Sequence, residues 1–308
     1  MKPPRWKVAI IGAGKVGSVL GRILADRGVP VVAVVSRSRS SAKKCARFVR
    51  CKLFSTSLND LPPETSLIMI TTPHDAVEEV GVALSRLEQL RFRRLHVCHA
   101  SGMLTADALA PLSARGATVF SFHPLQTFPR DFEPADIVKS IAGIYYGVDG
   151  TRKGIAAARR LSAQLGGHMI EVPPEMRVFY HAACVVASNH LTGLLAVLES
   201  MYRKLGNSRK NFFPVFKPIM MATMNNVGST SPAQALSGPV ARGGTETVAR
   251  HFEAVRTYAP ELLHYFASLT DETIALAARK GSLSPERVEE MRRLVRSQEL
   301  TSENGGKR

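Results

Sequence analysis

The sequence has few cysteines, and their spacing fits neither a disulfide framework nor a zinc site. Cys45, Cys51, Cys98 and Cys184 are the only four, and no two of them form a Cys-x-x-Cys pair. Zinc sites and redox motifs use such pairs, and small disulfide-stabilised secreted domains have far more cysteines for their length. We therefore expect reduced thiols and no metal site.

A long uninterrupted apolar run is also missing. A membrane-spanning helix needs about 20 consecutive apolar residues, and the nearest approach, residues 182–198, is interrupted by polar residues between 188 and 192. Residues 1–7 are polar and basic, which is not typical of a signal peptide. These observations predict a cytoplasmic protein with no membrane partner.

Acidic residues are scarce relative to basic ones. The 308-residue chain has 25 Asp and Glu against 41 Lys and Arg, which gives a formal net charge of +16. Such a balance can indicate a nucleic-acid partner. The basic residues are spread along the chain, however, and no basic run is interleaved with the aromatic side chains on which bases stack. We expect no nucleic-acid partner, and local use of basic groups against phosphates.

An apolar run leads directly into a glycine-rich turn near the start of the chain. Residues 8–11 are all apolar, a G-x-G-x-x-G motif follows, and a helical pattern extends to residue 26. In dinucleotide-binding domains the three glycines permit the tight turn, the approach of the pyrophosphate and close helix–strand packing. The helix N-terminus then faces the phosphates. The residues predicted to contact the cofactor here are Gly12, Gly14, Lys15, Val16 and Gly17.

The second predicted strand, residues 31–35, is not followed by the acidic residue that is typical of NAD sites. Such an acid, about 20 residues past the glycines, accepts the ribose hydroxyls. This chain has Ser36, Arg37, Ser38 and Arg39 at the corresponding place. A 2′-phosphate suits forked hydrogen bonds from arginine. The pattern therefore predicts NADPH rather than NADH.

Three later predicted strands end in polar residues, at TTPHD, HASG and FHPLQTF. Ligands of open parallel sheets bind at the carboxyl ends of the strands. We therefore expect Thr72 and Pro73 to line the nicotinamide side of a cleft, and Ser101 and His123 to face the substrate. For His123 the alternative is a structural turn histidine.

Strands and helices alternate in the first part of the chain, and the remainder has helical patterns. The alternation predicts an α/β Rossmann-type, doubly wound parallel sheet followed by an all-α C-terminal domain. We place an NADP-binding domain at 1–172 and a helical substrate and dimerisation domain at 173–308. Within the first domain we expect a polar loop at 129–140 and a strand at 141–148.

The first helix of the second half carries a polar stripe. At about 100° per residue, His181, Ser188 and Thr192 share one face, with Asn189 at its edge. A buried unpaired polar group costs about 1–3 kcal/mol, so the stripe needs either a satisfied core network or a bound substrate. Reduction of a carbonyl or imine needs a nearby proton donor, and histidine titrates in the right range. His181 and Asn189 are therefore candidate catalytic residues.

A glycine-rich break, SGPVARGG, interrupts the helical half. Its backbone N–H groups could bind a carboxylate, and an arginine could recognise the same anion through two hydrogen bonds. The candidate substrate-binding residues are Ser237, Gly238 and Arg242. The alternative for Arg242 is a helix cap or a surface ion pair, worth about 0–1 kcal/mol.

Taken together, these motifs resemble a family of predicted oxidoreductases with a Rossmann-like N-terminal domain and a helical C-terminal domain related to pyrroline-5-carboxylate reductase. The resemblance is carried by GAGKVG, TTPHDAV, HASG, SFHPLQTF, YHAACVVASN and ALSGPVARGG. It implies NADPH-dependent reduction of a small carboxylate in a cleft between the domains, and a homodimer built from the helical domains. Reduction of ketopantoate by some members makes a 2-oxo acid the expected substrate.

Two positions depart from the family's pattern. His74 and Gly244 stand where the family usually has acidic residues. Our leading hypothesis is a hydride transfer from the nicotinamide to a C=O or C=N carbon, with His181 or His123 as proton donor. Two alternatives remain open: a reductase of a cyclic imine such as pyrroline-5-carboxylate, and an NADP-binding sensor or scaffold without turnover.

Overall fold

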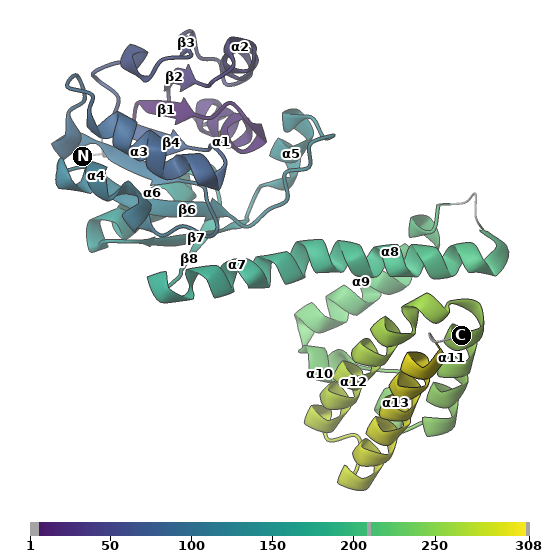
Figure 1. Cartoon of the computed structure of the whole chain (residues 1–308). Helices are drawn as coiled ribbons and strands as arrows, with labels where there is room; N and C mark the ends of the chain where they lie inside the picture. Colours follow the sequence, from purple (N-terminus) through teal and green to yellow (C-terminus); the bar gives the residue numbers. More distant parts are fainter. Residues whose placement is uncertain (1–5, 208–210, 306–308) are drawn as a thin grey trace. The chain divides into compact units, whose positions relative to one another are not determined.

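The computed structural model describes residues 6–207 and 211–305, and the chain forms two compact units, residues 1–188 and 189–308 (Figure 1). The strand–helix alternation ends at Glu171, close to the expected domain boundary after residue 172. The compact units divide the chain later, inside a continuous helix at Pro174–Gly206. The first turns of this helix pack on the sheet and therefore belong to the first unit.

The first unit is built on an eight-stranded sheet in the order β3-β2-β1-β4-β5-β6-β7-β8. Every neighbouring pair among the described strands is parallel except β6 and β7, which are antiparallel. The expected Rossmann-type sheet is thus confirmed, with its last two strands, β7 and β8, running opposite to the others. The strands are β1 (Val8–Ile11), β2 (Val31–Val35), β3 (Phe54–Ser55), β4 (Leu67–Ile70), β5 (His96–His99), β6 (Thr118–Pro124), β7 (Tyr145–Gly150) and β8 (His168–Glu171).

Helices cover both faces of the sheet, as Figure 1 shows. In β1, Val8 and Ile10 join one buried apolar cluster with side chains of α1 and α6, whereas Ala9 and Ile11 join a second cluster with side chains of α3 and α4. This alternation explains why β1 is apolar at every position. The helices of this unit are α1 (Lys15–Asp26), α2 (Arg39–Phe48), α3 (Val77–Ser85), α4 (Ala110–Ala114), α5 (Pro134–Ser140), α6 (Arg152–Leu165) and α7 (Arg177–Val185).

Two segments differ from the sequence-based expectation. The expected loop at 129–140 contains α5, which starts with a proline in its first turn and buries Ile137 in the cluster that also holds α1. The expected strand at 141–148 begins only at Tyr145, because Gly143 has φ of +77° and interrupts the extended backbone.

The second unit is entirely helical in its described part, which confirms the expected all-α region. Its small core lies between α11, α12 and α13 and includes the fully buried Phe252, Ile274 and Met291. In contrast, α9 buries none of its described residues, although Ile219 and Met224 are apolar. The helices are α8 (Leu191–Tyr202), α9 (Phe213–Ser229), α10 (Pro232–Ala235), α11 (Thr245–Tyr258), α12 (Leu263–Lys280) and α13 (Pro285–Gly305).

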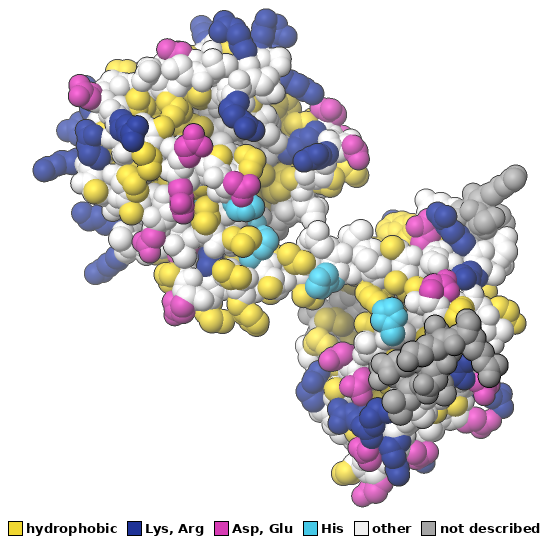
Figure 2. Space-filling view, viewed as in Figure 1, with side chains coloured by type: hydrophobic (Ala, Val, Ile, Leu, Met, Phe, Trp, Pro, Cys, Tyr) yellow, Lys and Arg dark blue, Asp and Glu magenta, His cyan; other side chains and the backbone are white. Residues whose placement is uncertain are grey.

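Charged side chains are distributed over both units. Figure 2 shows Lys and Arg scattered over the visible face of each unit rather than gathered into one stripe. Many of them pair with acidic residues, as Arg22 does with Asp26 and Arg250 with Glu246. On this face, the net positive charge produces no continuous basic groove.

Candidate functional site

The glycine-rich turn joins β1 to α1, and each glycine has a different reason for lacking a side chain. Gly12 has φ of +105°, and a Cβ there would lie 2.7 Å from the backbone of Thr71. A Cβ at Gly17 would lie 2.4 Å from the carbonyl oxygen of Gly12. Around Gly14 no atom of the described chain lies within 4 Å of a Cβ position, which leaves space at the first turn of α1. Val16 is half-buried and packs against the core.

The end of β4 supplies polar groups beside this turn. The hydroxyl of Thr71 donates to the Gly12 carbonyl oxygen at 2.7 Å. The hydroxyl of Thr72 is buried and has no hydrogen-bond partner among the described residues. Pro73 follows and is exposed. Because a buried, unsatisfied hydroxyl costs about 1–3 kcal/mol, Thr72 stays a candidate contact for a bound ligand.

A pocket of about 490 Å³ opens beside the glycine-rich turn, with α1 and α2 on one side and the start of α5 on the other. Lys15 and Lys44 line it together with Gly14. The ammonium of Lys15 donates to the carbonyl oxygen of Phe132, and that of Lys44 lies 3.6 Å from the carboxylate of Glu133. The pocket thus combines a helix N-terminus with two cations, an arrangement that suits phosphate groups.

The end of β2 carries the residues predicted to recognise a 2′-phosphate. Ser36 is half-buried, and the Ser38 hydroxyl accepts a hydrogen bond from an N–H in the first turn of α2. Arg37 is exposed, and the guanidinium of Arg39 lies 5.4 Å from the ring centroid of Phe54. Ser38 therefore serves as a helix cap, and the two arginines remain accessible beside it.

The structure brings together three of the predicted catalytic residues in the first unit. His123 at the end of β6 and His181 in α7 have ring centroids 6.0 Å apart. Ser101 lies just before Gly102, and a Cβ at Gly102 would lie 3.0 Å from Nε2 of His123 and 2.4 Å from Cδ2 of His181. Nδ1 of His123 lies 2.9 Å from the hydroxyl of Tyr180. We call this set of five residues the histidine corner.

A buried ion pair supports the histidine corner from inside the unit. The side chains of Arg177 and Asp149 are 1% and 2% exposed, with Nη1 and Oδ2 3.4 Å apart. Nη2 of Arg177 donates to the Ser101 carbonyl oxygen at 3.0 Å, and its guanidinium lies 5.3 Å from the ring centroid of Tyr180. Asp149 also accepts hydrogen bonds from the Ser121 hydroxyl and a backbone N–H. Arg177 thereby fixes both the Ser101 loop and the phenol.

Burial keeps His123 and His99 uncharged at neutral pH. It lowers the pKa of His123 to about 4, with a further contribution from the charge of Arg177. It likewise lowers the pKa of His99 to about 4, although Nε2 of His99 bonds the Thr105 carbonyl oxygen at 2.9 Å. Burial raises the pKa of the Tyr180 phenol. At neutral pH, His123 is therefore a neutral imidazole, which argues against its acting as an imidazolium acid.

Four residues of this region lie outside the set predicted from the sequence, namely Gly102, Asp149, Arg177 and Tyr180. One signal for them was present, because Arg177, Tyr180 and His181 fall on one face of a helix at helical spacing. A lone arginine among apolar helix residues indicates a buried partner. Asp149 gives no such signal, since it meets Arg177 only through the tertiary fold.

Asn189 begins the second unit and is exposed, within a π-helical segment at Val186–His190. A π turn contains more residues than an α turn, so the α-helical spacing does not continue from His181 to Thr192. The single polar face expected for this helix is therefore interrupted. Ser188 donates to a carbonyl oxygen four residues earlier at 2.7 Å.

The predicted anion-binding residues lie in the second unit. Ser237 and Arg242 are exposed, and Gly238 has φ of +94°. The Pro239 carbonyl oxygen accepts from the N–H groups of Arg242 and Gly244 at 3.2 and 2.9 Å. Since the amides of Arg242 and Gly244 are bonded within the turn, the candidate anion contacts here are Ser237, Gly238 and the Arg242 side chain.

By length and composition, one helix in the described chain could cross a membrane. It spans Pro174–Gly206, and none of its most apolar window is buried. It carries Arg177, which pairs with Asp149 inside the first unit. A bilayer core disfavours such a charge, whereas a helix that packs on protein accommodates it.

Two family models match the chain. A model of a Rossmann-like domain matches residues 1–124, and a model described as a domain of unknown function, DUF2520, matches residues 144–273. The chain is therefore similar to a Rossmann-like domain in its first part and to a DUF2520 domain after it. This combination confirms the family resemblance seen in the sequence motifs.

Solved structures show the same fold at low sequence identity. A "putative NADP oxidoreductase" from Bacteroides fragilis is 20% identical with a TM-score of 0.68, over 87% of this chain and 97% of that one. Protein TM1727 from Thermotoga maritima is 19% identical with a TM-score of 0.67, over 89% and 99%. A reductive aminase from Aspergillus terreus, in complex with NADPH and ethyl-5-oxohexanoate, is 15% identical with a TM-score of 0.60, over 96% and 93%. No curated protein sequence matches.

Proposed function

We propose that this protein is an NADPH-dependent oxidoreductase that reduces a C=O or C=N bond of a small carboxylate. The observation that carries the proposal is the open glycine-rich turn with two lysines beside it, in a sheet whose β2 ends in arginines rather than an acid. The names of the Bacteroides and Aspergillus structures, which mention NADP and NADPH, support the same cofactor.

The residues of the first unit fit this cofactor. The space at Gly14 and the ammonium groups of Lys15 and Lys44 suit the pyrophosphate, and Arg37 with Arg39 suits the 2′-phosphate. The orphan hydroxyl of Thr72 at the end of β4, with Pro73 after it, would contact the nicotinamide half. When bound, NADPH supplies the hydride for reduction.

The chain's own residues would hold the substrate and manage the proton. Reduction places a hydride on the carbon and a proton on the oxygen or nitrogen, and we propose His181 as the side chain that delivers this proton. Ser101 and Asn189 would position the substrate. The residues proposed to hold its carboxylate are Ser237, Gly238 and Arg242.

For the substrate we propose a 2-oxo acid such as ketopantoate. A cyclic imine such as pyrroline-5-carboxylate is the second candidate, favoured by the fold likeness to a reductive aminase. A sensor or scaffold that binds NADP without turnover is the third. Steady-state assays with both substrates discriminate the first two, and binding without oxidation of NADPH identifies the third.

The cofactor assignment is tested by measuring NADPH and NADH affinities through nicotinamide fluorescence. We expect NADPH to bind at least about tenfold more tightly, a difference of about 1.4 kcal/mol, and Arg37→Ala with Arg39→Ala to remove that preference. Arg152→Ala, an exposed arginine at the start of α6, is the matched control. Equal affinities in the wild type, or no binding, would contradict the proposal. The role of His181 fails if His181→Ala binds NADPH and turns over at the wild-type rate.

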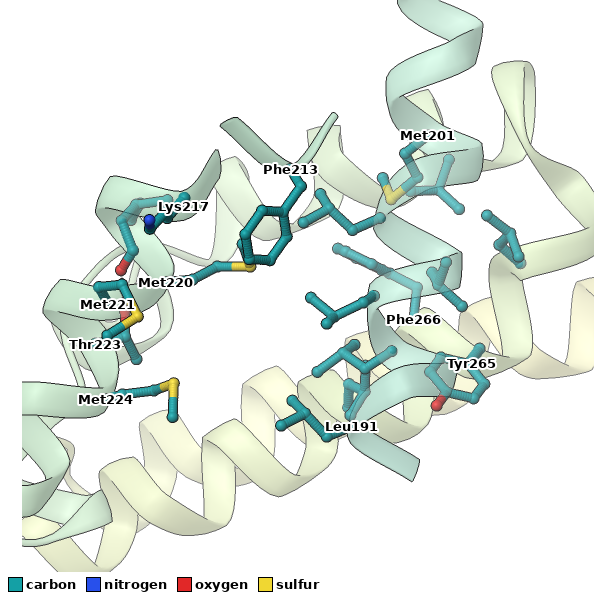
Figure 3. A pocket seen from close by; sticks show the side chains of 18 residues that line it. Leu191, Met201, Phe213, Lys217, Met220, Met221, Thr223, Met224, Tyr265 and Phe266 are labelled. Atoms are coloured by element: carbon teal, nitrogen blue, oxygen red, sulfur yellow. Dashed lines mark hydrogen bonds between the residues drawn. The ribbon is translucent and has the colours of Figure 1, made fainter. Parts of the chain in front are cut away.

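We further propose a homodimer formed through the helical unit. A pocket of about 520 Å³ in this unit is lined almost entirely by apolar side chains of α8, α9 and α12, and Figure 3 shows Phe213 and Met220 of α9 around it. Burial of apolar surface contributes about 25 cal/mol per Å², so a second copy over these faces would be stabilising. A cytoplasmic location, with no nucleic-acid or membrane partner, remains a prediction.

A further inference from the structure

The two ring nitrogens of His123 have different surroundings. Nδ1 lies 2.9 Å from the Tyr180 hydroxyl, and the two rings meet edge to face with centroids 5.7 Å apart. Nε2 faces Gly102, where a Cβ would lie 3.0 Å away. One nitrogen is therefore engaged inside the unit, while the other faces a residue without a side chain.

Tyr180 is held in place on two sides. Its hydroxyl lies against Gly147 of β7, where a Cβ would be only 2.2 Å away. On the ring side, the guanidinium of Arg177 lies 5.3 Å from the centroid. A cation beside a phenol makes its hydroxyl a stronger hydrogen-bond donor, while burial keeps the proton on the oxygen. The phenol is thus a fixed, protonated donor.

The charged and titratable groups that face His123 favour its neutral form. Arg177 and His181 from α7, and His99 from β5, each disfavour a positive charge on His123. Asp149 on β7 is the acid of this region, and it is engaged by Arg177. Cys184 also interacts with the Tyr180 hydroxyl, and this interaction raises the pKa of the phenol, so the proton stays on the phenol oxygen.

We propose that Tyr180 is a positioning residue, whose hydroxyl donates a hydrogen bond to Nδ1 of His123 and so keeps the imidazole proton on Nε2, facing the substrate. This inference rests on the proposed reductase function. The Nε2–H group donates a hydrogen bond to the carbonyl oxygen or imine nitrogen, where negative charge grows as the π electrons move away from the carbon that receives the hydride. The proton that completes the alcohol or amine comes from His181 or water, and His123 keeps its own.

The absence of a side chain at Gly102 is part of this arrangement. A methyl group there would meet His181 at 2.4 Å and Nε2 of His123 at 3.0 Å, so it would occupy the space into which Nε2–H points. Gly102→Ala is therefore expected to lower kcat while leaving the affinity for NADPH unchanged, because the glycine-rich turn lies on β1 rather than on the β5 loop.

The tautomer is tested directly by ¹⁵N NMR of histidine-labelled full-length protein without ligands. We expect wild-type His123 to carry its proton on Nε2 and to stay neutral to about pH 5. Tyr180→Phe removes the bond to the neutral ring, so we expect mixed tautomers, a raised pKa and a kcat lowered about tenfold to a hundredfold, below the loss of about 10²–10³ expected when a whole oxyanion donor is removed. Tyr145→Phe, on the same sheet and 52% exposed, is the matched control.

Two results would overturn this inference. One is a proton on Nδ1 of wild-type His123, and the other is an unchanged tautomer and pKa in a folded Tyr180→Phe protein. NADPH affinity, measured separately by fluorescence, reports on the proposed function. If the protein binds NADPH but His123 carries its proton on Nδ1, only the role of Tyr180 is refuted. If His123 carries its proton on Nε2 but the protein does not bind NADPH, the Tyr180 bond is supported and the reductase function is refuted.

Discussion

The two units of the molecule bury their apolar side chains to very different extents. In the first unit, core residues such as Ile10, Phe120 and Tyr146 are completely buried. In the second, Ile219 is 65% exposed and Met224 is 57% exposed, although both are apolar. The strands of the first unit therefore bury their apolar side chains, although Phe179 of α7 stays 69% exposed, whereas α9 of the second unit leaves an apolar face for a partner to cover.

The same contrast applies to charged and titratable groups. The first unit encloses His99 and the Arg177–Asp149 pair. In the described part of the second unit, the histidines are all exposed; they are His190, His251 and His264. Perturbations of buried charge should consequently act on the first unit, and perturbations of exposed apolar surface on the second.

The largest effect is expected from breaking the buried ion pair. Asp149→Ala leaves the Arg177 guanidinium without its counter-ion, and such a loss typically costs about 3–5 kcal/mol. Urea denaturation, followed by hydrogen exchange of each unit, should show the loss in the first unit alone. Asp136→Ala is the control, because its exposed pair with Lys139 is worth about 0–1 kcal/mol. Equal effects of the two variants would refute the stabilising role of the pair.

The next prediction concerns the exposed face of the second unit. Ile219→Asp places a charge on the proposed dimer surface, and we expect at least about a hundredfold loss in dimer affinity, or about 2.7 kcal/mol. Sedimentation velocity over a concentration series measures it. Tyr258→Asp is the control, since this 70%-exposed residue does not line the apolar pocket. A wild-type monomer at all concentrations would contradict the dimer.

Alanine variants of two glycines in the first unit should separate an effect on cofactor binding from an effect on folding. A Cβ at Gly17 meets the Gly12 carbonyl oxygen, so Gly17→Ala should destabilise the unit by about 1–3 kcal/mol. Gly14→Ala meets no described atom, so it should preserve the melting temperature and weaken NADPH binding about tenfold. Thermal denaturation and fluorescence titration test both. Unchanged NADPH affinity in Gly14→Ala would show that the pyrophosphate does not approach this residue.

The smallest effect is the response to mild acid. Burial lowers the pKa of His99 from 6.5 to about 4, so as the pH falls the unfolded chain takes up this proton before the folded chain does. The stability that the neutral imidazole contributes above pH 6.5 is therefore lost as the pH falls toward 4. For this imidazole we expect a loss of about 1 kcal/mol between pH 6.5 and about pH 5.5. Urea midpoints of the first unit should fall in this window, and His168→Gln, an exposed histidine, should leave the slope unchanged. NMR titration of His99 near pH 6.5 would contradict the prediction.

Much of the fold could be predicted because its strands are continuous apolar runs and its first turn has a distinctive glycine spacing. The reversal of β7 and β8 could not be predicted, since the direction in which a strand pairs is not written in its own residues. The sequence did not predict α5, because only Ile137 and its neighbours reach the core and Pro134 is as typical of a loop as of the start of a helix.

The site was predictable only in part, because some of its residues come together only in the folded protein. His123 and His181 attract notice as polar groups at a strand end and on an apolar helix, and the structure brings them together. The pair that supports the two histidines, Asp149 and Arg177, could not be predicted, because these residues meet only after β7 and α7 have packed. The clearest missed signal is Arg177, an arginine at helical spacing from Tyr180 and His181.

The π-helical segment at Val186–His190 sets how the long helix responds to a change in chain length. A π turn takes up one more residue than an α turn, so removing one residue there, other than Asn189, would let the helix close into regular α turns. Leu191 and Leu194 would still face the apolar pocket that they line. Removing a second residue would turn every later side chain by about 100° about the helix axis. The segment should therefore tolerate one deletion and not two.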